Sequence, residues 1–289
     1  MDAILFDKGI PGMRMERLRR ASPFEMKVLH AHTFWEIYYL LEGECIYFID
    51  GRSYALERGA LVFVGTNVLH RTLAERHERI LIELDPATLA DFGMQLPLLE
   101  QNAIIAVQLP PPQQRQVEAF FHCIAESLGG EAPGYAARVR LYLLALLSYV
   151  DEHARGAPAV PRDRSPRHRL AEAVIRYLDA HYDQDVTLEE VAQALYVSKY
   201  HLSRAFKEVT GCTLVEYLTA VRLQHARYLL ASTRLHVADI ASRTGFNSLS
   251  HFNRVFLRQV GMPPLQYRKA LSRHGEERAT GTEQGLFLP

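Results

Sequence analysis

The sequence predicts an α+β multidomain protein, in which a β-barrel and a helical hairpin precede an all-α domain with two helix-turn-helix units. Three observations support this fold class. Short runs rich in β-branched and aromatic residues follow one another between residues 24 and 84. Helical spacing of apolar residues begins near residue 113, and one helix-turn-helix pattern occurs twice in the last third of the chain.

The β-barrel is expected within residues 1–109, the first predicted domain. Its strand-like runs include FWEIYYLLEG, ECIYFIDG and ALVFVG, and most of them end at Gly or Asp. Short, evenly spaced strands with such turn residues are typical of a small antiparallel barrel or sandwich. The charged segment at 13–20 lies before these runs and is interpreted as an unstructured N-terminal arm.

Two helices, expected over Gln113–Leu128 and Tyr135–His153, form the helical hairpin of residues 110–153. The second helix is apolar over more of its circumference than contact with one core requires. This leaves two alternatives, because the hairpin either forms the interface of a homodimer or packs on its own barrel. Its apolar run Val139–Val150 is too short to span a bilayer, so no membrane association is expected.

The ends of the chain and its cysteines favour a cytoplasmic protein. An acidic residue stands at position 2, and no apolar run follows of the length that a signal peptide requires. The three cysteines are widely separated and include no C-x-x-C pair, which is typical of reduced thiols. Residues 273–289 are polar and are expected to form a mobile tail.

Charge is distributed unevenly, although 33 basic and 33 acidic side chains give the whole chain a net charge of zero. Residues 1–164 hold 17 basic and 21 acidic side chains, a net charge of −4, whereas residues 165–273 hold 15 and 9, a net charge of +6. A predicted linker rich in proline and arginine, residues 154–167, separates two domains. The basic domain, residues 168–272, is therefore the candidate for a nucleic-acid partner.

Two helix-turn-helix units are expected in this basic domain. Thr187 and Glu190 match a capping box at the start of TLEEVAQAL, and Ser198 is the expected N-cap of KYHLSRAFKEVTG. The second unit repeats this layout with HVADIASRTGF and SHFNRVFLRQVG, which opens at Ser248 or Ser250. A helix about 27 Å long, at 1.5 Å per residue, separates the units, so that their second helices can enter successive major-groove faces.

The second helix of each unit has one apolar face and one polar, cationic face, as a helix that reads the major groove requires. Arg204 and Arg254 are the expected readers of a base or phosphate. Arg222 and Arg227, on the long helix, are expected to contact phosphate or to cover the helix face. The other outward-facing side chains are Lys199, Tyr200, Ser203, Lys207, Ser250, His251, Asn253 and Arg258.

The segment 168–272 resembles the DNA-binding domain of the AraC family of bacterial transcription regulators. The resemblance rests on IASRTGFNSLSHFNRVFLRQVGMPPLQYR, with its Gly-Phe, Phe-x-Arg-x-Phe, Gly-x-x-Pro and Tyr-Arg pattern. It implies a bihelical reader of double-stranded DNA that recruits RNA polymerase as an activator, beside a second domain that senses a signal. The base-facing positions that it implies are Tyr200, Ser203, Arg204, Leu249, Ser250, His251, Asn253 and Arg254. Leu249 departs from the polar residue of the family, so weaker readout or contact with a thymine methyl group is expected there.

A cluster of potential ligands stands in the predicted barrel, as His30-x-His32-x-x-x-Glu36 followed by His70. Alternate residues of a strand share one face, so the first three are expected to point inward together with Phe34 and Tyr38. Two imidazoles and a carboxylate, with His70 as a fourth ligand, form a set that binds divalent metals. The spacing resembles the first motif of the cupin superfamily, whereas the second motif is degraded.

Three interpretations of this cluster remain open. As a cupin-like sensor, the barrel binds a small-molecule inducer, such as a sugar or related metabolite, through His30, His32, Phe34, Glu36, Tyr38 and His70. As a metal-dependent cupin enzyme fused to a DNA-binding domain, it holds a divalent metal on His30, His32, Glu36 and His70. As a structural network, the histidines only satisfy one another. The sensor interpretation leads; it requires no cofactor and predicts a regulator that is not an enzyme.

The complete hypothesis is a ligand-controlled, sequence-specific transcription activator that works as a homodimer. A constitutive architectural protein is the remaining alternative, and it would bind DNA with weak sequence discrimination.

Overall fold

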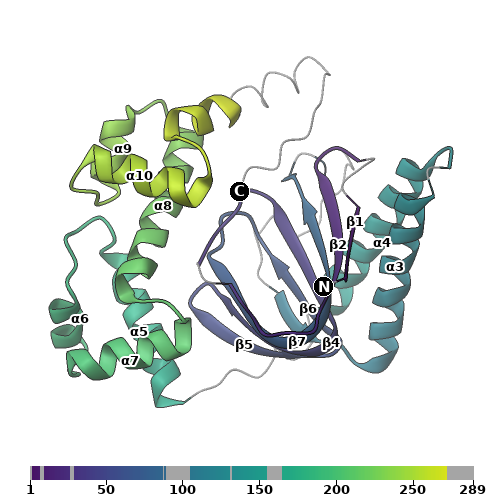
Figure 1. Ribbon diagram of the computed structural model, residues 1–289, viewed down its shortest axis with the longest axis horizontal. Coiled ribbons are helices and arrows are strands. Elements are labelled where there is room, and N and C mark those ends of the chain that lie inside the picture. Colours follow the sequence, from purple (N-terminus) through teal and green to yellow (C-terminus); the bar gives the residue numbers. More distant parts are fainter. Residues whose placement is uncertain are drawn as a thin grey trace.

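An antiparallel β-sheet domain is followed in the chain by a helical C-terminal domain, and two further helices lie on the far side of the sheet (Figure 1). The α+β fold class expected from the sequence is confirmed. The computed structural model describes residues 2–6, 10–26, 29–86, 88, 105–130, 132–154 and 165–271. The predicted tail 273–289 and most of the predicted linker 154–167 lie outside these residues.

Eight antiparallel strands in the described part form one sheet, in the order β1-β2-β7-β4-β6-β8, with β3 paired to β7 and β5 to β4. Their bounds are β1 Asp2–Phe6, β2 Met13–Arg20, β3 Phe24–Glu25, β4 Trp35–Ile49, β5 Arg52–Glu57, β6 Ala60–Val64, β7 His70–Leu84 and β8 Ile105–Gln108. The long strands β4 and β7 pair along most of their length, with register shifts on either side of Gly43. Such irregularities bend strands, and the sheet curls into a barrel-like shape (Figure 1). We call this curved sheet the barrel.

The charged segment 13–20 is strand β2 and not the unstructured arm expected from its composition. It pairs with β7 over all eight of its residues. Met13, Met15 and Leu18 are buried, and arginines of β2 form ion pairs with glutamates of β7. The interpretation failed because most charges on β2 have an oppositely charged partner on β7, which the local sequence does not show.

Alternation along β4 assigns its residues to the two faces of the sheet. Trp35 and Ile37 pack in a core that the outer face shares with helices α3 (Pro111–Gly129) and α4 (Tyr135–Ala154). Tyr38 belongs to a second core inside the barrel. The two helices of the hairpin therefore cover the outside of the barrel, and a separate core fills part of its inside.

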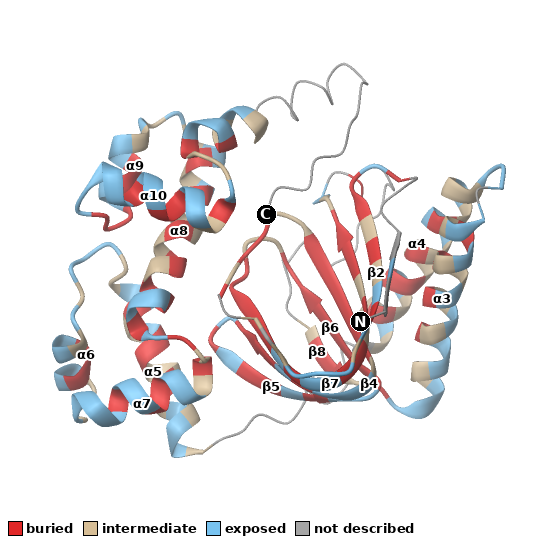
Figure 2. Cartoon of the chain, in the orientation of Figure 1, coloured by how far each residue is buried: buried red, intermediate tan, exposed pale blue. Residues whose placement is uncertain are grey.

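Helix α4 packs on its own barrel, which was one of the two alternatives. Its buried residues are Val139, Leu143, Leu146, Leu147 and Val150. Leu141 of the same helix is 64% exposed. Part of the apolar surface of α4 is therefore not covered by this chain (Figure 2). Of the helices described, none has the length and hydropathy that a membrane span needs.

Helices α5 to α10 of the C-terminal domain contain both expected helix-turn-helix units, and a further helical segment follows at 264–271. The helices are α5 Pro166–Ala180, α6 Leu188–Ala194, α7 Lys199–Thr210, α8 Leu214–Ser232, α9 Val237–Arg243 and α10 Leu249–Val260. The first unit consists of α6 and α7, the second consists of α9 and α10, and the 19-residue α8 lies between them. Helix α5 begins inside the segment that was expected to be linker.

Capping residues set the limits of helices in both helix-turn-helix units, as the sequence predicts. Thr187 and Glu190 form the capping box of α6. Ser198 caps α7 and Ser248 caps α10, each by accepting a hydrogen bond from a backbone N–H inside its helix. Both α7 and α10 end at a glycine in the left-handed conformation, as expected for such a C-cap.

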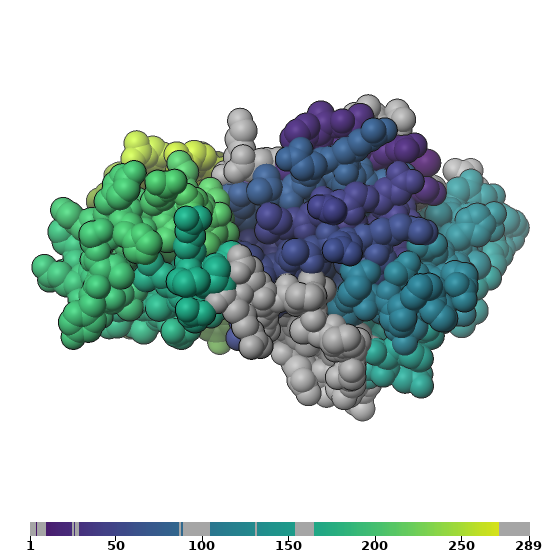
Figure 3. Space-filling view, turned by 90° about the horizontal axis from the view of Figure 1, so that it is seen from below, coloured from purple at the N-terminus to yellow at the C-terminus, as the bar shows by residue number. Residues whose placement is uncertain are grey.

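The first helix-turn-helix unit packs directly against the barrel (Figure 3). Phe48 of β4 lies in one hydrophobic core with α5, α7 and α8, and its ring centroid is 6.5 Å from that of Tyr217. Gly51, in the β4–β5 turn, has a φ of +77° and sits against Ile175 of α5, where a Cβ would lie 2.8 Å from that side chain. The turn therefore requires glycine both for its backbone conformation and for this close approach.

Candidate functional site

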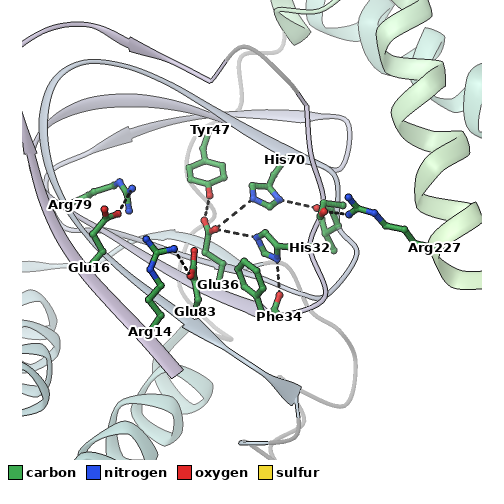
Figure 4. Close-up of polar contacts among 12 residues, drawn as sticks. Arg14, Glu16, His32, Phe34, Glu36, Tyr47, His70, Arg79, Glu83 and Arg227 are labelled. Carbon is green, nitrogen blue, oxygen red and sulfur yellow. Dashed lines mark hydrogen bonds and ion pairs between the residues drawn. The ribbon is translucent and has the colours of Figure 1, made fainter. Parts of the chain in front are cut away.

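Three histidines and one glutamate meet inside the barrel, near the C-terminal domain. Figure 4 shows His32, His70 and Glu36 of this group. His30 and His32 precede β4, Glu36 lies on β4, and His70 is the first residue of β7. One ring nitrogen of each histidine lies within 4.8 Å of the others. Glu36 Oε2 is 3.2 Å from His32 Nε2 and 3.6 Å from His70 Nε2. The fold thus gathers the four residues predicted as metal ligands, which we call the His/Glu cluster.

Backbone carbonyl groups fix the orientation of two imidazoles in the cluster. His32 Nδ1 lies 2.8 Å from the carbonyl oxygen of Phe34, and His70 Nδ1 lies 2.8 Å from that of Val68. A carbonyl oxygen only accepts hydrogen bonds, so both Nδ1 atoms carry the hydrogen. In a neutral ring the Nε2 lone pair then faces the carboxylate of Glu36, which is also an acceptor. A cation, either a proton or a metal ion, is needed between them to make this contact favourable.

Tyr47 completes the surroundings of Glu36, because its hydroxyl donates a hydrogen bond to Glu36 Oε1. Burial by itself raises the pKa of Glu36, but the nearby imidazoles of His32 and His70 outweigh burial and hold that pKa well below its usual range. Burial and the nearby carboxylate raise the pKa of the Tyr47 hydroxyl, which therefore keeps its proton. The sequence suggested Tyr47 as aromatic surface for a ligand or as core but not its bond to Glu36, since Tyr47 lies eleven residues beyond Glu36 and approaches it where β4 bends.

Phe34 and Tyr38, the other predicted ligand residues, lie differently from the expectation. Phe34 stacks on His32, with ring centroids 3.8 Å apart and planes 6° apart. Tyr38 lies deeper in the barrel core, and its hydroxyl is buried with no hydrogen-bond partner among the described residues. The residues directly before β4 are not a strand, so simple alternation does not align all five predicted side chains in one row.

Ion pairs extend the polar interior from Glu36 towards β2 (Figure 4). Arg79 and Glu16 are 2.7 Å apart, and Arg14 and Glu83 are 3.2 Å apart. Glu83 stands opposite Glu36 in the β4–β7 register, and burial raises its pKa. These residues were missed because β2 was interpreted as an unstructured arm. The alternation of Met or Leu with charged residues was the signal that could have revealed them.

A second candidate site is the outer face of the two reading helices, α7 and α10. Leu202 and Phe206 on α7, and Phe252 and Phe256 on α10, are fully buried on the opposite face. Every predicted DNA-facing side chain is exposed. These are Lys199, Tyr200, Ser203, Arg204 and Lys207 on α7, and Leu249, Ser250, His251, Asn253, Arg254 and Arg258 on α10. Both helices therefore present their polar groups to solvent in the arrangement that major-groove binding needs.

Arg222 and Arg227 make contacts other than those expected of them. Arg222 donates to two backbone carbonyls of its own domain, at 2.7 Å each. Arg227 is buried and donates to the carbonyl oxygen of Ala31, the residue between His30 and His32. Phosphate contact by Arg227 was therefore a wrong expectation. Its guanidinium joins α8 to the chain segment that carries the His/Glu cluster (Figure 4).

Comparison with known proteins matches both parts of the chain. A family described as AraC-like ligand binding domain matches residues 20–147, and one described as helix-turn-helix domain matches residues 191–270. The HTH-type transcriptional activator RhaS of Klebsiella pneumoniae (strain 342) is 28% identical over 280 residues, which cover 91% of this chain and 94% of the relative. RhaR of Escherichia coli O139:H28 is 25% identical over 267 residues, which cover 85% and 88%. A solved C-terminal domain of AraT, a response regulator from Geobacillus stearothermophilus, is 37% identical, covers 37% of this chain and 88% of that domain, and has a TM-score of 0.35.

Replacement of Tyr47 by Phe is expected to destabilise the protein, because the buried carboxylate of Glu36 loses a donor. Hydrogen bonds to charged groups contribute about 1.5–3 kcal/mol, and a loss of this size should appear in urea unfolding followed by circular dichroism. Tyr38→Phe is the matched control, since that buried hydroxyl has no partner among the described residues. An equal loss in both variants would contradict the importance of the Tyr47–Glu36 bond.

Proposed function

The chain belongs to the AraC family of transcription regulators, and from this membership we propose that it activates transcription by binding specific DNA sequences under control of a small molecule in its barrel. As a member of this family it is a regulator and not an enzyme. One observation carries the proposal, namely that the segment holding His30 and His32 contacts α8 directly. The candidate ligand site is therefore physically joined to the helix that connects the two helix-turn-helix units.

Double-stranded DNA is the proposed partner of α7 and α10. Two exposed, capped helices are held apart by α8, which is about 28 Å long at 1.5 Å per residue, close to the roughly 34 Å that separates successive major-groove faces. Arg204 and Arg254 occupy matching positions on the two helices and are the proposed base readers. The exposed Leu249 offers an apolar contact for a thymine methyl group.

A small polar metabolite, such as a sugar, is the proposed effector. The barrel interior offers it an acceptor in Glu36, a ring face in Phe34, and charged donors in Arg14 and Arg79. Polar groups of fixed position beside an aromatic ring are the usual chemistry of small-molecule sites. Tyr38 would supply one further hydroxyl, which is unpaired among the described residues.

A divalent metal ion is a second candidate for the same site, and the His/Glu cluster itself favours it. The Nδ1 atom of His30 and the Nε2 atom of His70 are buried without hydrogen-bond partners among the described residues. Two nitrogens on one zinc ion lie at most about 4.2 Å apart, since each bond is about 2.1 Å. The ring nitrogens of His30, His32 and His70 lie within 4.8 Å of one another, which is only slightly more than that value. His30, His32, His70 and Glu36 would hold the ion, which would neutralise the buried carboxylate.

Coupling between the two sites is proposed to pass through the contacts of the barrel with α7 and α8. Beside the Arg227 contact, Gln224 of α8 donates to the carbonyl of Asn67, near His70 in the chain. Ser53 donates to the carbonyl of Val209 near the end of α7, at 3.4 Å. A ligand that binds one arrangement of these segments more tightly than another shifts the population of domain arrangements.

A homodimer would place two such readers on paired half-sites, and the exposed side of α4 around Leu141 is our proposed interface. Recruitment of RNA polymerase by the bound dimer would then activate transcription. We place the protein in the cytoplasm, where a bacterial transcription regulator meets its DNA.

Sequence-specific binding can be tested after selection of a preferred duplex from a random DNA pool. Arg204→Ala and Arg254→Ala are each expected to weaken binding to the selected duplex by about tenfold to hundredfold, since a bidentate base contact is lost. Fluorescence anisotropy at constant salt measures this, and Arg115→Ala on α3 is the control for the loss of one exposed charge. Equal losses on selected and random duplexes would instead favour a constitutive architectural protein that contacts phosphate alone.

Zinc binding can be tested on chelator-treated protein by calorimetry and thermal unfolding. If the cluster holds a metal, one equivalent of Zn²⁺ binds and raises the Tm, and His70→Ala abolishes both effects. His122→Ala removes an exposed histidine of α3 and should change neither. A rise in Tm with a sugar but none with Zn²⁺ would exclude the metal and support the metabolite.

Removal of the Arg227 guanidinium is expected to loosen the barrel from α8. In Arg227→Met, backbone amides of residues 29–35 and 66–71 should exchange hydrogen faster than in the wild type, because these segments lose a fixed contact. Arg222→Met is the control, since that side chain binds only carbonyls of its own domain. Unchanged exchange in Arg227→Met would argue against coupling through this residue.

A further inference from the structure

The two helix-turn-helix units have matching backbones but different charges on their reading helices. Arg204 on α7 and Arg254 on α10 stand at equivalent positions, six residues after the N-caps Ser198 and Ser248. Four residues after each arginine the units differ, because α7 has Glu208 where α10 has Arg258. This difference reverses the charge beside the proposed base reader.

Glu208 holds Arg204 through one edge of the guanidinium. Arg204 Nε donates to Glu208 Oε1 at 2.8 Å, one helical turn away. The other carboxylate oxygen, Oε2, lies 3.1 Å from Nη1 of Arg167, which is next to the first residue of α5. This hydrogen bond uses the Nε edge, and Arg204 also contacts the Tyr200 side chain. The bond to Glu208 therefore leaves the terminal nitrogens of the guanidinium for a bidentate contact with guanine O6 and N7.

No such partner is present on α10. The sequence of this helix, LSHFNRVFLRQV, contains no acidic residue, and neither Arg254 nor Arg258 forms an ion pair with any residue that the structure describes. On the first unit, Lys199 is also paired, with Glu189 of α6. The cations of α7 are therefore partly neutralised within the chain, whereas the cations of α10 remain available to phosphate.

Building on the proposed function, we infer that Glu208 is a positioning residue that makes the first unit the stricter sequence discriminator, whereas the second unit adds stronger attraction to phosphate to its own base contact. On DNA of the wrong sequence, Arg204 would have to leave the Glu208 carboxylate in order to bind a phosphate. One anionic partner would replace another, so the net attraction to DNA would be small. Opposite a correctly placed guanine, the two Nη groups bind without breaking the bond to Glu208. Specificity then rests on two effects. Arg204 is attracted to the correct guanine, and the Glu208 carboxylate repels phosphate and so disfavours non-specific binding.

Glu208→Ala tests this inference in the full-length protein. The variant is expected to bind random duplex about threefold to tenfold more tightly, since one negative charge beside phosphate is removed. Its preference for the selected duplex over the same duplex with one guanine replaced by 7-deazaguanine should fall by a similar factor at the base that Arg204 reads. Glu126→Ala is the matched control, because Glu126 is an exposed helical acid that also forms an i,i+4 pair, with His122 on α3.

The reciprocal variant, Arg258→Glu, places an acid four residues after Arg254. It is expected to weaken binding to random duplex more than to the selected duplex, so the ratio of the two affinities rises. A Glu208→Ala protein with unchanged random binding and unchanged guanine preference would overturn the inference. If the wild type itself binds selected and random duplexes equally, the proposed function fails, and that result is distinct from failure of the role of Glu208.

Discussion

Burial of the Glu36 carboxylate is the constraint on which the barrel interior depends. A charged group removed from water must be matched by hydrogen bonds or opposite charge. Tyr47 supplies a donor from the far part of the same strand, and His32 and His70 converge from outside it. These demands require β4 to bend and require the start of β7 to lie beside the segment before β4. The polar site therefore depends on the curvature of the sheet, which brings the partners of Glu36 together.

The same segments connect the barrel to the DNA-binding domain. Ala31 lies between two histidines of the cluster and accepts from the buried Arg227 of α8. A buried guanidinium bound only to carbonyl oxygen remains partly uncompensated, so this contact is a weaker attachment than an equally buried apolar one. The apolar contacts around Phe48 hold the domains together, whereas the Arg227 contact is polar and lies directly beside the histidines.

The duplicated reading units illustrate how one backbone can serve two roles. Caps, buried phenylalanines and terminal glycines are shared, so both units present their helices in the same way. The charge differences lie among exposed residues, and exposed charges change helix stability little. Such positions are free to diverge in charge, which alters the balance between phosphate attraction and base reading without cost to the fold.

Local rules in the sequence determined the C-terminal domain almost completely. Capping residues and helical spacing act within a few residues, so Thr187, Ser198 and the outward placement of Arg204 could be read directly from the chain. The sequence also predicted an antiparallel β-sheet domain, and the four residues of the His/Glu cluster that it singled out lie close together. Tertiary structure alone decided that Tyr47 joins them, that residues 13–20 form a strand, and that Arg227 faces the barrel and not DNA. Each of these depends on a partner distant in the chain, and a partner across a sheet or a domain boundary leaves no periodic signal in the local sequence.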